Sequence, residues 1–150
     1  MIVADTSLIA PCVLPGEMTE IALAVYRCDS EWVAPPLWRS EVRNVLATHM
    51  RLKGLSLALA KEAWRRASSI VDDTPEPAAA DVLDLAHASG ASAYDCEFVA
   101  IAKSLGIPLV TADRRLARLF PTVCLSPETF PRDPGSGENM VRPTQGGRRK

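Results

Sequence analysis

The 150-residue chain has few of the residues from which several common kinds of functional site are built. It contains only two histidines, and its four cysteines are scattered without a Cys-x-x-Cys pair: Cys12, Cys28, Cys96 and Cys124. This spacing is poor for zinc and offers no disulfide framework, so we expect small buried thiols in a reducing cytoplasm. A Gly-x-Ser-x-Gly elbow, a glycine-rich phosphate loop and a dinucleotide-binding fingerprint are also missing. These absences leave the acidic residues as the main candidates for chemistry.

The sequence also lacks a long apolar run and an excess of charge of one sign. Apolar residues make up 47% of it, but they are interrupted well before the roughly 18 residues that a membrane span needs. The opening residues 1–5 have no basic segment and place an acid where a signal peptide needs apolar residues. The formal net charge is −1, so nucleic-acid binding would depend on a local basic patch. We therefore expect a cytoplasmic protein without a membrane segment.

Short apolar runs alternate with helical patterns, and this alternation predicts an α/β fold. Strands are expected at 2–4, 32–34, 108–111 and 122–125. One helix is expected to follow residues 5–7 and another to follow Asp113, and further helices are expected at 20–27, 40–52, 57–70, 79–89 and 93–105. Ser40 is expected to cap the helix at 40–52. We predict one domain over residues 1–130, with helices on both faces of a small, mostly parallel sheet. Residues 131–150, rich in glycine and proline, are expected to form a flexible C-terminal tail.

Four acidic residues share one place in this predicted fold. Asp5 and Asp113 follow strands, whereas Glu41 and Asp95 are expected in the first turns of helices. In a parallel α/β sheet, the carboxyl ends of strands and the amino ends of helices lie along one edge, where ligands bind. Each acid alone has a simpler interpretation, because such residues cap helices or complement the helix dipole. Together they would repel one another and raise one another's pKa unless a cation neutralised them.

The oxygen atoms of these side chains indicate which cation would fit. Carboxylates are hard ligands, which favour Mg²⁺ or Mn²⁺ over zinc. Such ions lower the pKa of a bound water and clamp phosphate oxygens during in-line attack. The hydroxyls of Thr6, Ser7 and Thr111 are expected to orient the carboxylates.

Four short motifs carry a family resemblance. They are Val-Ala-Asp-Thr-Ser at 3–7, Glu-Val-Arg-Asn-Val-Leu at 41–46, Tyr-Asp-Cys at 94–96 followed by Val-Ala-Ile-Ala at 99–102, and Thr-Ala-Asp-Arg at 111–114. In this order they resemble the PIN domain, and most of all the small VapC-type toxins of bacterial and archaeal toxin–antitoxin pairs. The resemblance extends from Met1 to about Leu125. Cys96 stands where the family often has alanine, and we expect it to pack inward. The tail after Pro131 lies outside the family pattern.

This resemblance implies a PIN-like domain that acts as an endoribonuclease dependent on Mg²⁺ or Mn²⁺. Asp5, Glu41, Asp95 and Asp113 would be its catalytic and metal-binding acids, with Thr6, Ser7 and Thr111 in support. It further implies a homodimer and a partner antitoxin that holds the enzyme inactive. The target RNA differs widely within these toxins, and no residue in this chain specifies it.

Several arginines are candidates for binding an RNA substrate, because phosphate contacts supply much of the affinity for nucleic acid. Arg114 and Arg115 follow Asp113, and Arg43 lies close to Glu41. The alternative is that they are solvated side chains or ion-pair partners of the four acids. Glu97 is expected at the surface rather than among the ligands. A dimer or antitoxin groove is expected at the apolar positions Ile9, Val13, Leu55, Leu57 and Leu59.

Two other functions remain open from the sequence. One is a non-catalytic PIN-like binding module that acts through an antitoxin partner, and the other is a housekeeping nuclease that processes RNA. A degenerate module would be expected to have lost one or more acids, so the presence of all four favours an enzyme. A small DNA-binding gene immediately upstream would favour a toxin over a housekeeping nuclease.

Overall fold

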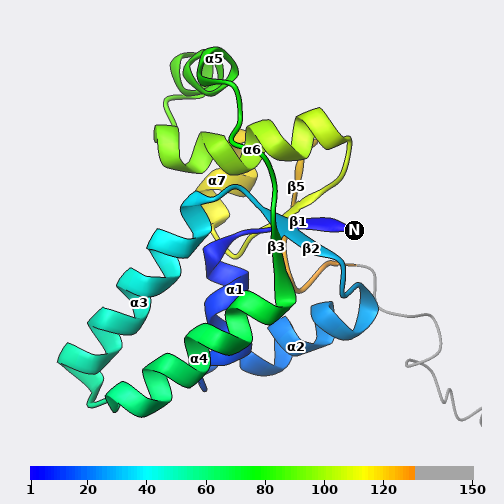
Figure 1. Ribbon diagram of the computed structural model, residues 1–150. Helices are drawn as coiled ribbons and strands as arrows, with labels where there is room; N and C mark the ends of the chain where they lie inside the picture. Colours follow the sequence, from blue (N-terminus) through cyan, green and yellow to red (C-terminus); the bar gives the residue numbers. More distant parts are fainter. Residues whose placement is uncertain (131–150) are drawn as a thin grey trace, which may run out of the picture.

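The computed structural model describes residues 1–130, which form a parallel sheet of five strands covered by helices (Figure 1). The strands are β1 (Ile2–Ala4), β2 (Trp32–Ala34), β3 (Val71–Asp73), β4 (Leu109–Val110) and β5 (Cys124–Leu125). Their order in the sheet is β3-β2-β1-β4-β5, and every pairing is parallel. The helices are α1 (Thr6–Val13), α2 (Thr19–Cys28), α3 (Leu37–Lys53), α4 (Leu57–Ile70), α5 (Ala79–Ser89), α6 (Ala93–Leu105) and α7 (Arg114–Leu119).

Strand β1 occupies the centre of the sheet because its residues are apolar and can be buried on both faces. Ile2, Val3 and Ala4 are at most 1% exposed. Val3 is in register with Val33 of β2 on one side and Leu109 of β4 on the other. In Figure 1, α5 and α6 lie above the sheet, and α1, α2 and α4 lie below it. The expected α/β class with helices on both faces is therefore confirmed.

Trp38, in the first turns of α3, ties that helix to the edge of the sheet. Its side chain is completely buried, and its indole N–H donates to Oδ1 of Asp73 at 2.8 Å. The ring stacks on Trp64 of α4, with 5.6 Å between centroids and 25° between planes. Arg39 pairs with Asp73 and lies over the Trp38 ring at 5.0 Å. The amino end of α3 is thus held by packing, hydrogen bonding and an ion pair.

Two elements differ from the sequence-based expectation. Helix α3 begins at Leu37, so Ser40 lies inside the helix and is not its cap. The reason is the preceding Pro35-Pro36 pair, because proline suits the start of a helix, where a backbone N–H has no helical partner. Strand β3 was not expected, since two of its three residues, Asp72 and Asp73, are exposed acids at the edge of the sheet.

The cysteines are free thiols, as expected, but they are not all buried. Cys12, Cys96 and Cys124 are buried, whereas Cys28 in the last turn of α2 is exposed. The inward packing of Cys96 is confirmed, because its side chain is 0% exposed. Within residues 1–130, the helices are too short or too polar to cross a bilayer. The tail predicted for residues 131–150 lies outside the part of the chain that the structure describes.

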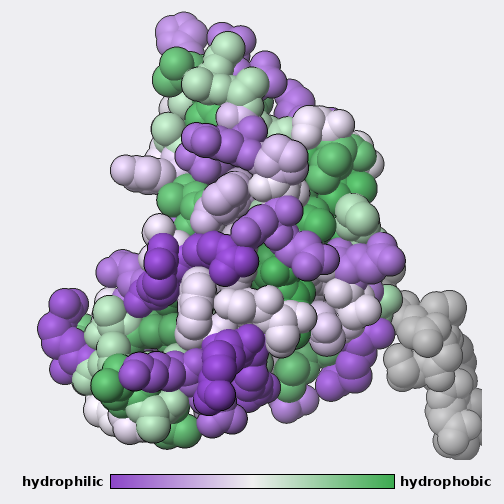
Figure 2. Space-filling view, viewed as in Figure 1, coloured by the Kyte–Doolittle hydropathy of each residue, from purple (hydrophilic) through white to green (hydrophobic). Residues whose placement is uncertain are grey.

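Exposed leucines gather where α3 turns into α4, at the lower left of Figure 2. Leu52, Leu57 and Leu59 are 68%, 59% and 56% exposed. By contrast, Ile9 and Val13 belong to the core, so their assignment to a docking groove was wrong. They were misassigned because α1 is covered by three other helices and has little free surface.

Candidate active site

The structure brings the four predicted acids to the carboxyl edge of the sheet. Asp5 follows β1 and Asp113 lies beyond β4, while Glu41 and Asp95 come from α3 and α6. Figure 1 shows the beginnings of α1, α3 and α6 and the short α7 on this same side. Burial raises the pKa of Glu41, and the charges of Asp5 and Asp95 raise it further. Burial likewise raises the pKa of the Cys124 thiol to about 11, with added effects of Asp5 and Asp113. Glu41 is therefore near enough to Asp5 and Asp95 to be influenced by their charges, and Asp5 and Asp113 both lie near Cys124.

Asp5 is held by a chain of hydroxyl groups. Ser7 and Thr111 both donate to its Oδ2 atom, Thr111 at 2.8 Å. Each hydroxyl also accepts a backbone N–H, Ser7 from Ala112 at 2.9 Å and Thr111 from Asp113 at 3.0 Å. Because these N–H groups occupy acceptor sites on the hydroxyl oxygens, the hydroxyl protons are left to point at the carboxylate. The position of Asp5 Oδ2 is thus fixed from two sides.

The charge of Asp5 has no cation to balance it in the described part of the chain. Burial raises its pKa, although the hydrogen bonds from Ser7 and Thr111 act in the opposite direction. No lysine or arginine within residues 1–130 forms an ion pair with it. Asp5 is also the N-cap residue of α1, yet in this part of the chain its side chain makes no capping hydrogen bond. The backbone N–H groups of Ser7 and Thr6, at the start of α1, also lower the pKa of Asp5, so a capping contribution remains. A bound cation would offset the charge that no basic residue in this part of the chain pairs with.

Glu41 lies deeper in α3 than the sequence suggested. The helix starts at Leu37, four residues before Glu41. Glu41 is therefore outside the first turn and does not complement the amino end of the helix dipole. Instead, Thr6 donates its hydroxyl proton to Oε2 of Glu41. The predicted hydroxyl contacts to the acids are therefore all present, from Thr6 to Glu41 and from Ser7 and Thr111 to Asp5.

Asp95 and Asp113 differ in what their carboxylates do. Ser92 caps α6 by accepting the backbone N–H of Asp95 at 3.0 Å, which leaves the Asp95 carboxylate free of the capping role. Asp113 does cap α7, because its Oδ1 atom accepts from the backbone N–H groups of Arg115 and Leu116 at 2.8 and 3.0 Å. Asp95 nevertheless lies in the first turn of α6, where an acid complements the helix dipole, so the simpler interpretations hold for Asp95 and Asp113.

Sequence reasoning missed Glu97 as a member of this acidic edge. We expected it at the surface, but it is half-buried, and its negative charge raises the pKa of Glu41. Burial raises the pKa of Glu97 itself, with a further effect of Glu76 from the loop between β3 and α5. No local periodicity signals this arrangement, because the residues around Glu97 come from separate elements.

The predicted substrate-binding arginines are exposed and lie near the edge. Arg115 donates from Nη2 to the carbonyl oxygen of Gly90 at 3.3 Å, which joins α7 to the turn between α5 and α6. Arg43 donates to the carbonyl of Arg39 and lies 5.5 Å from the centroid of the Trp64 ring. Arg114 is exposed. Within residues 1–130 none of the three forms an ion pair with the four acids.

The carboxylates form an open edge rather than a closed cage. Within residues 1–130, no three His, Cys, Asp or Glu side chains stand together in metal-binding geometry. Mg²⁺ does not need such a cage, since it keeps several waters and binds through one or two carboxylates together with substrate phosphates. The donor set is made of hard oxygens and includes the half-buried Asp5, which forms no ion pair with a residue of the described part of the chain. These residues therefore fit a divalent ion that is completed by substrate.

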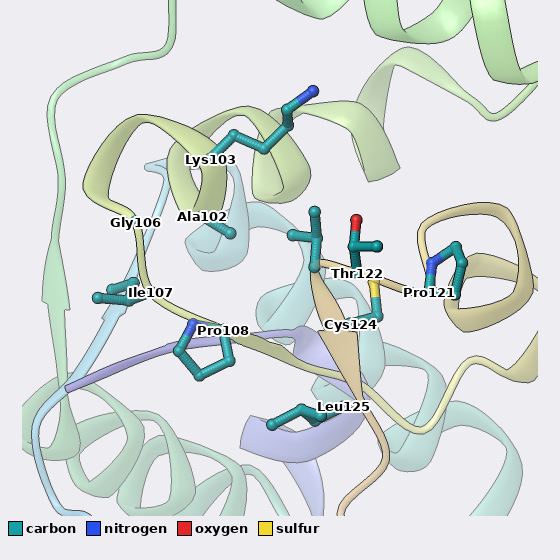
Figure 3. Close-up of a pocket in the computed structure, with 10 residues that line it drawn as sticks. Ala102, Lys103, Gly106, Ile107, Pro108, Pro121, Thr122, Cys124 and Leu125 are labelled. Atoms are coloured by element: carbon teal, nitrogen blue, oxygen red, sulfur yellow. The ribbon is translucent and has the colours of Figure 1, made fainter.

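A surface hollow of about 410 Å³ lies elsewhere, at the amino ends of β4 and β5 (Figure 3). Its lining includes Lys103, Pro108, Thr122 and Cys124, but no acidic residue. Small-molecule sites are usually concave cavities, whereas the acids here lie on an open edge.

Replacing Glu41 with glutamine is expected to raise the melting temperature of the metal-free protein at neutral pH. The folded state raises the pKa of Glu41, so this group stabilises the fold below its unfolded-state pKa, and that stabilisation is lost as the pH rises through the folded-state pKa. Glutamine removes the buried charge and keeps an oxygen for Thr6. We expect a gain of about 2–4 °C, the change that roughly 1 kcal/mol produces in a domain of this size. Thermal unfolding in EDTA measures it.

The exposed Glu62 of α4 provides the matched control. Glu62→Gln should leave the melting temperature unchanged. The gain in Glu41→Gln should shrink as the pH falls toward the ordinary glutamate pKa of about 4.3. A gain of constant size from pH 7 to pH 4 would show that buried charge is not its cause.

Comparison with known proteins identifies the family. Residues 2–119 match the family model described as the PIN domain, and the chain belongs to this family. It is 31% identical over 127 residues to Ribonuclease VapC3 of Pyrobaculum aerophilum, an alignment that covers 81% of this chain and 96% of that protein. The crystal structure of PAE2754 from the same organism is similar in fold, with a TM-score of 0.70 at 23% identity, covering 85% of this chain and 83% of that one. The VapC-type PIN-domain resemblance inferred from the motifs is thus confirmed.

Proposed function

We propose that this protein is an endoribonuclease that depends on Mg²⁺ or Mn²⁺ and serves as the toxin of a VapBC-type toxin–antitoxin pair. The observation that carries the proposal is the half-buried Asp5 carboxylate, which two hydroxyls fix and which lies close to Glu41. Within residues 1–130 no lysine or arginine forms an ion pair with it. Such an arrangement is costly for a structural residue and useful for a metal ligand. The similarity to Ribonuclease VapC3 supports RNA as the substrate.

Each acid has a role in this proposal. Asp5, Asp95 and Asp113 would hold the divalent ion, some of them directly and the others through bound water, and the ion would supply a water of lowered pKa and positive charge at the phosphate oxygens. Glu41 would bind the ion directly or through a water, and its raised pKa makes it a better proton acceptor. Thr6, Ser7 and Thr111 keep the carboxylates in place through the observed hydrogen bonds.

The arginines extend the site beyond the scissile phosphate. Arg115 is tied to the turn before α6, and Arg43 stands on α3, two residues beyond Glu41. Together with Arg114 they would bind the phosphates on either side of the cut. Their cationic side chains offset the repulsion between RNA and the acids.

The first test is a calorimetric titration with Mn²⁺. Wild-type protein should bind the ion in the micromolar-to-millimolar range, and Asp95→Asn should reduce the affinity at least about tenfold, the factor that corresponds to losing about 1.4 kcal/mol. Asp84→Asn, an exposed acid on α5, is the matched control and should bind as wild type does. If the wild-type protein binds no Mn²⁺, the acids are structural, and the non-catalytic binding module becomes the better description.

The partners follow from the same proposal. The exposed Leu52, Leu57 and Leu59 at the turn between α3 and α4 offer an apolar surface on which an antitoxin helix can lay its apolar face. We also propose a homodimer and a cytoplasmic location, where free thiols stay reduced. A housekeeping nuclease would use the same chemistry, and an antitoxin gene immediately upstream would distinguish the toxin from it.

A further inference from the structure

Tyr94 is the only exposed aromatic side chain within residues 1–130. It is 64% exposed, whereas the other tyrosine, the tryptophans and the phenylalanines of this part of the chain are buried or half-buried. Tyr94 lies in the first turn of α6, directly before Asp95. Ser92 caps this turn, so the backbone that carries Tyr94 is well anchored. An aromatic ring is therefore exposed in the same helical turn that carries one of the acids of the candidate active site.

Within the described part of the chain, no hydrogen bond or aromatic contact gives this ring a role in holding the fold together. Within residues 1–130, the Tyr94 hydroxyl makes no hydrogen bond, and the ring forms no aromatic pair and lies under no cation. Covering an exposed ring with a ligand lowers the free energy of the complex, because apolar area is removed from water. The ligand expected at this edge carries flat aromatic bases, which stack well on tyrosine.

A cation lies on the same side of the fold. Arg115 of α7 reaches the carbonyl oxygen of Gly90, four residues before Tyr94, and its guanidinium is exposed. Single-stranded nucleic acid is commonly bound by such a combination of an aromatic face for the base and a cation for the phosphate. The two residues belong to different helices, and the hydrogen bond to Gly90 joins α7 to the turn that leads into α6.

We propose that Tyr94 stacks on an unpaired base adjacent to the scissile phosphate, while Arg115 binds a phosphate of the same segment. This inference rests on the proposed ribonuclease function and adds the residue that positions the substrate. Every base has a π face, so Tyr94 selects for an unpaired nucleotide at one position rather than for a particular base. A paired base cannot reach the ring without first leaving its stack.

The test compares Tyr94→Ala and Tyr94→Phe with wild type on an unstructured, 5′-labelled oligoribonucleotide in Mn²⁺. Stacking on an aromatic side chain contributes about 1–3 kcal/mol per base, so Tyr94→Ala should raise KM, and Kd by anisotropy, about 5- to 150-fold. The value of kcat should change less than about threefold, because the acids are untouched. Tyr94→Phe keeps the ring and should stay within about twofold of wild type. Leu105→Ala, at the exposed far end of α6, is the control and should leave both constants unchanged.

Abasic substitution identifies the stacked nucleotide. Oligonucleotides with one abasic site at each position in turn are compared for binding. Wild type should bind more weakly when one particular position is abasic, and the affinity of Tyr94→Ala should not change when that position is abasic. Annealing the oligonucleotide to its complement should bring the affinity of wild type down toward that of Tyr94→Ala. Unchanged KM and Kd in Tyr94→Ala, or a loss in Tyr94→Phe as large as in Tyr94→Ala, would overturn the stacking role.

Failure of this inference is distinguishable from failure of the proposed function. If wild type cleaves RNA and Asp5→Asn does not, while Tyr94→Ala behaves as wild type, only the role of Tyr94 is overturned. If wild type neither binds nor cleaves RNA in Mn²⁺, both proposals are overturned.

Discussion

Replacing Asp5 with asparagine is expected to abolish RNA cleavage while the fold is retained. Asparagine keeps one side-chain oxygen that can accept from Ser7 and Thr111, so the local hydrogen bonds survive. It removes the negative charge that would hold the divalent ion. Such electrostatic stabilisation is worth several kcal/mol in the transition state, and each 1.36 kcal/mol is a factor of ten in rate, so we expect a loss of at least about 10²- to 10³-fold.

The measurement is single-turnover cleavage of an RNA substrate in Mn²⁺, with circular dichroism as the check on folding. Asp84→Asn again serves as the control, since Asp84 is an exposed acid on α5. Cleavage by Asp5→Asn at the wild-type rate would contradict the four-acid site. The variant should also unfold at a slightly higher temperature in EDTA at neutral pH, because burial raises the pKa of Asp5 and the buried charge is then absent.

Of the substitutions proposed for this protein, Trp38→Ala is expected to cause the largest decrease in the free energy of unfolding. The side chain is fully buried, stacks on Trp64 and donates to Asp73. Removing a buried tryptophan costs about 3–5 kcal/mol, which corresponds to a decrease in melting temperature on the order of 10 °C in a domain of this size. Chemical denaturation measures the free-energy change. Since α3 carries Glu41, activity should fall as the amino end of the helix loosens.

Trp38→Phe keeps the result interpretable if the alanine variant does not fold. Phenylalanine retains much of the packing and loses the N–H, while Asp73 keeps its ion pair with Arg39. We expect an intermediate loss of about 1–2 kcal/mol. A cost below about 1 kcal/mol for Trp38→Ala would mean that packing at this edge does not hold α3.

Much of the fold could be predicted because its signals are local. The apolar run at β1, the helix from Leu57 to Ile70 and the stop of α6 at Gly106 each depend on neighbouring residues. Gly106 has a φ of 65°, a left-handed conformation that suits glycine at the end of a helix. The shared edge of the four acids also followed from local signals, because the topology of a parallel sheet places strand ends and helix starts together.

The missed features depend on contacts between distant residues. The raised pKa of Glu97 depends partly on the charge of Glu76, which comes from another loop, and the burial of Ile9 depends on helices packed around α1. Strand β3 is recognisable only from its pairing with β2, because aspartates such as Asp72 and Asp73 are disfavoured in strands. Helical periodicity likewise could not show that the proline pair would start α3 at Leu37.

The hydrogen bond from Thr111 to Asp5 joins residues that are 106 positions apart. Strand β1 is made first, but β4, which completes its pairing and brings Thr111 to Asp5, is made near the end of the domain. A chain still being synthesised therefore has Asp5 but no arrangement to hold it. The order of strands in the sheet therefore allows the hydrogen bonds around Asp5 to form only when nearly the whole domain has been made.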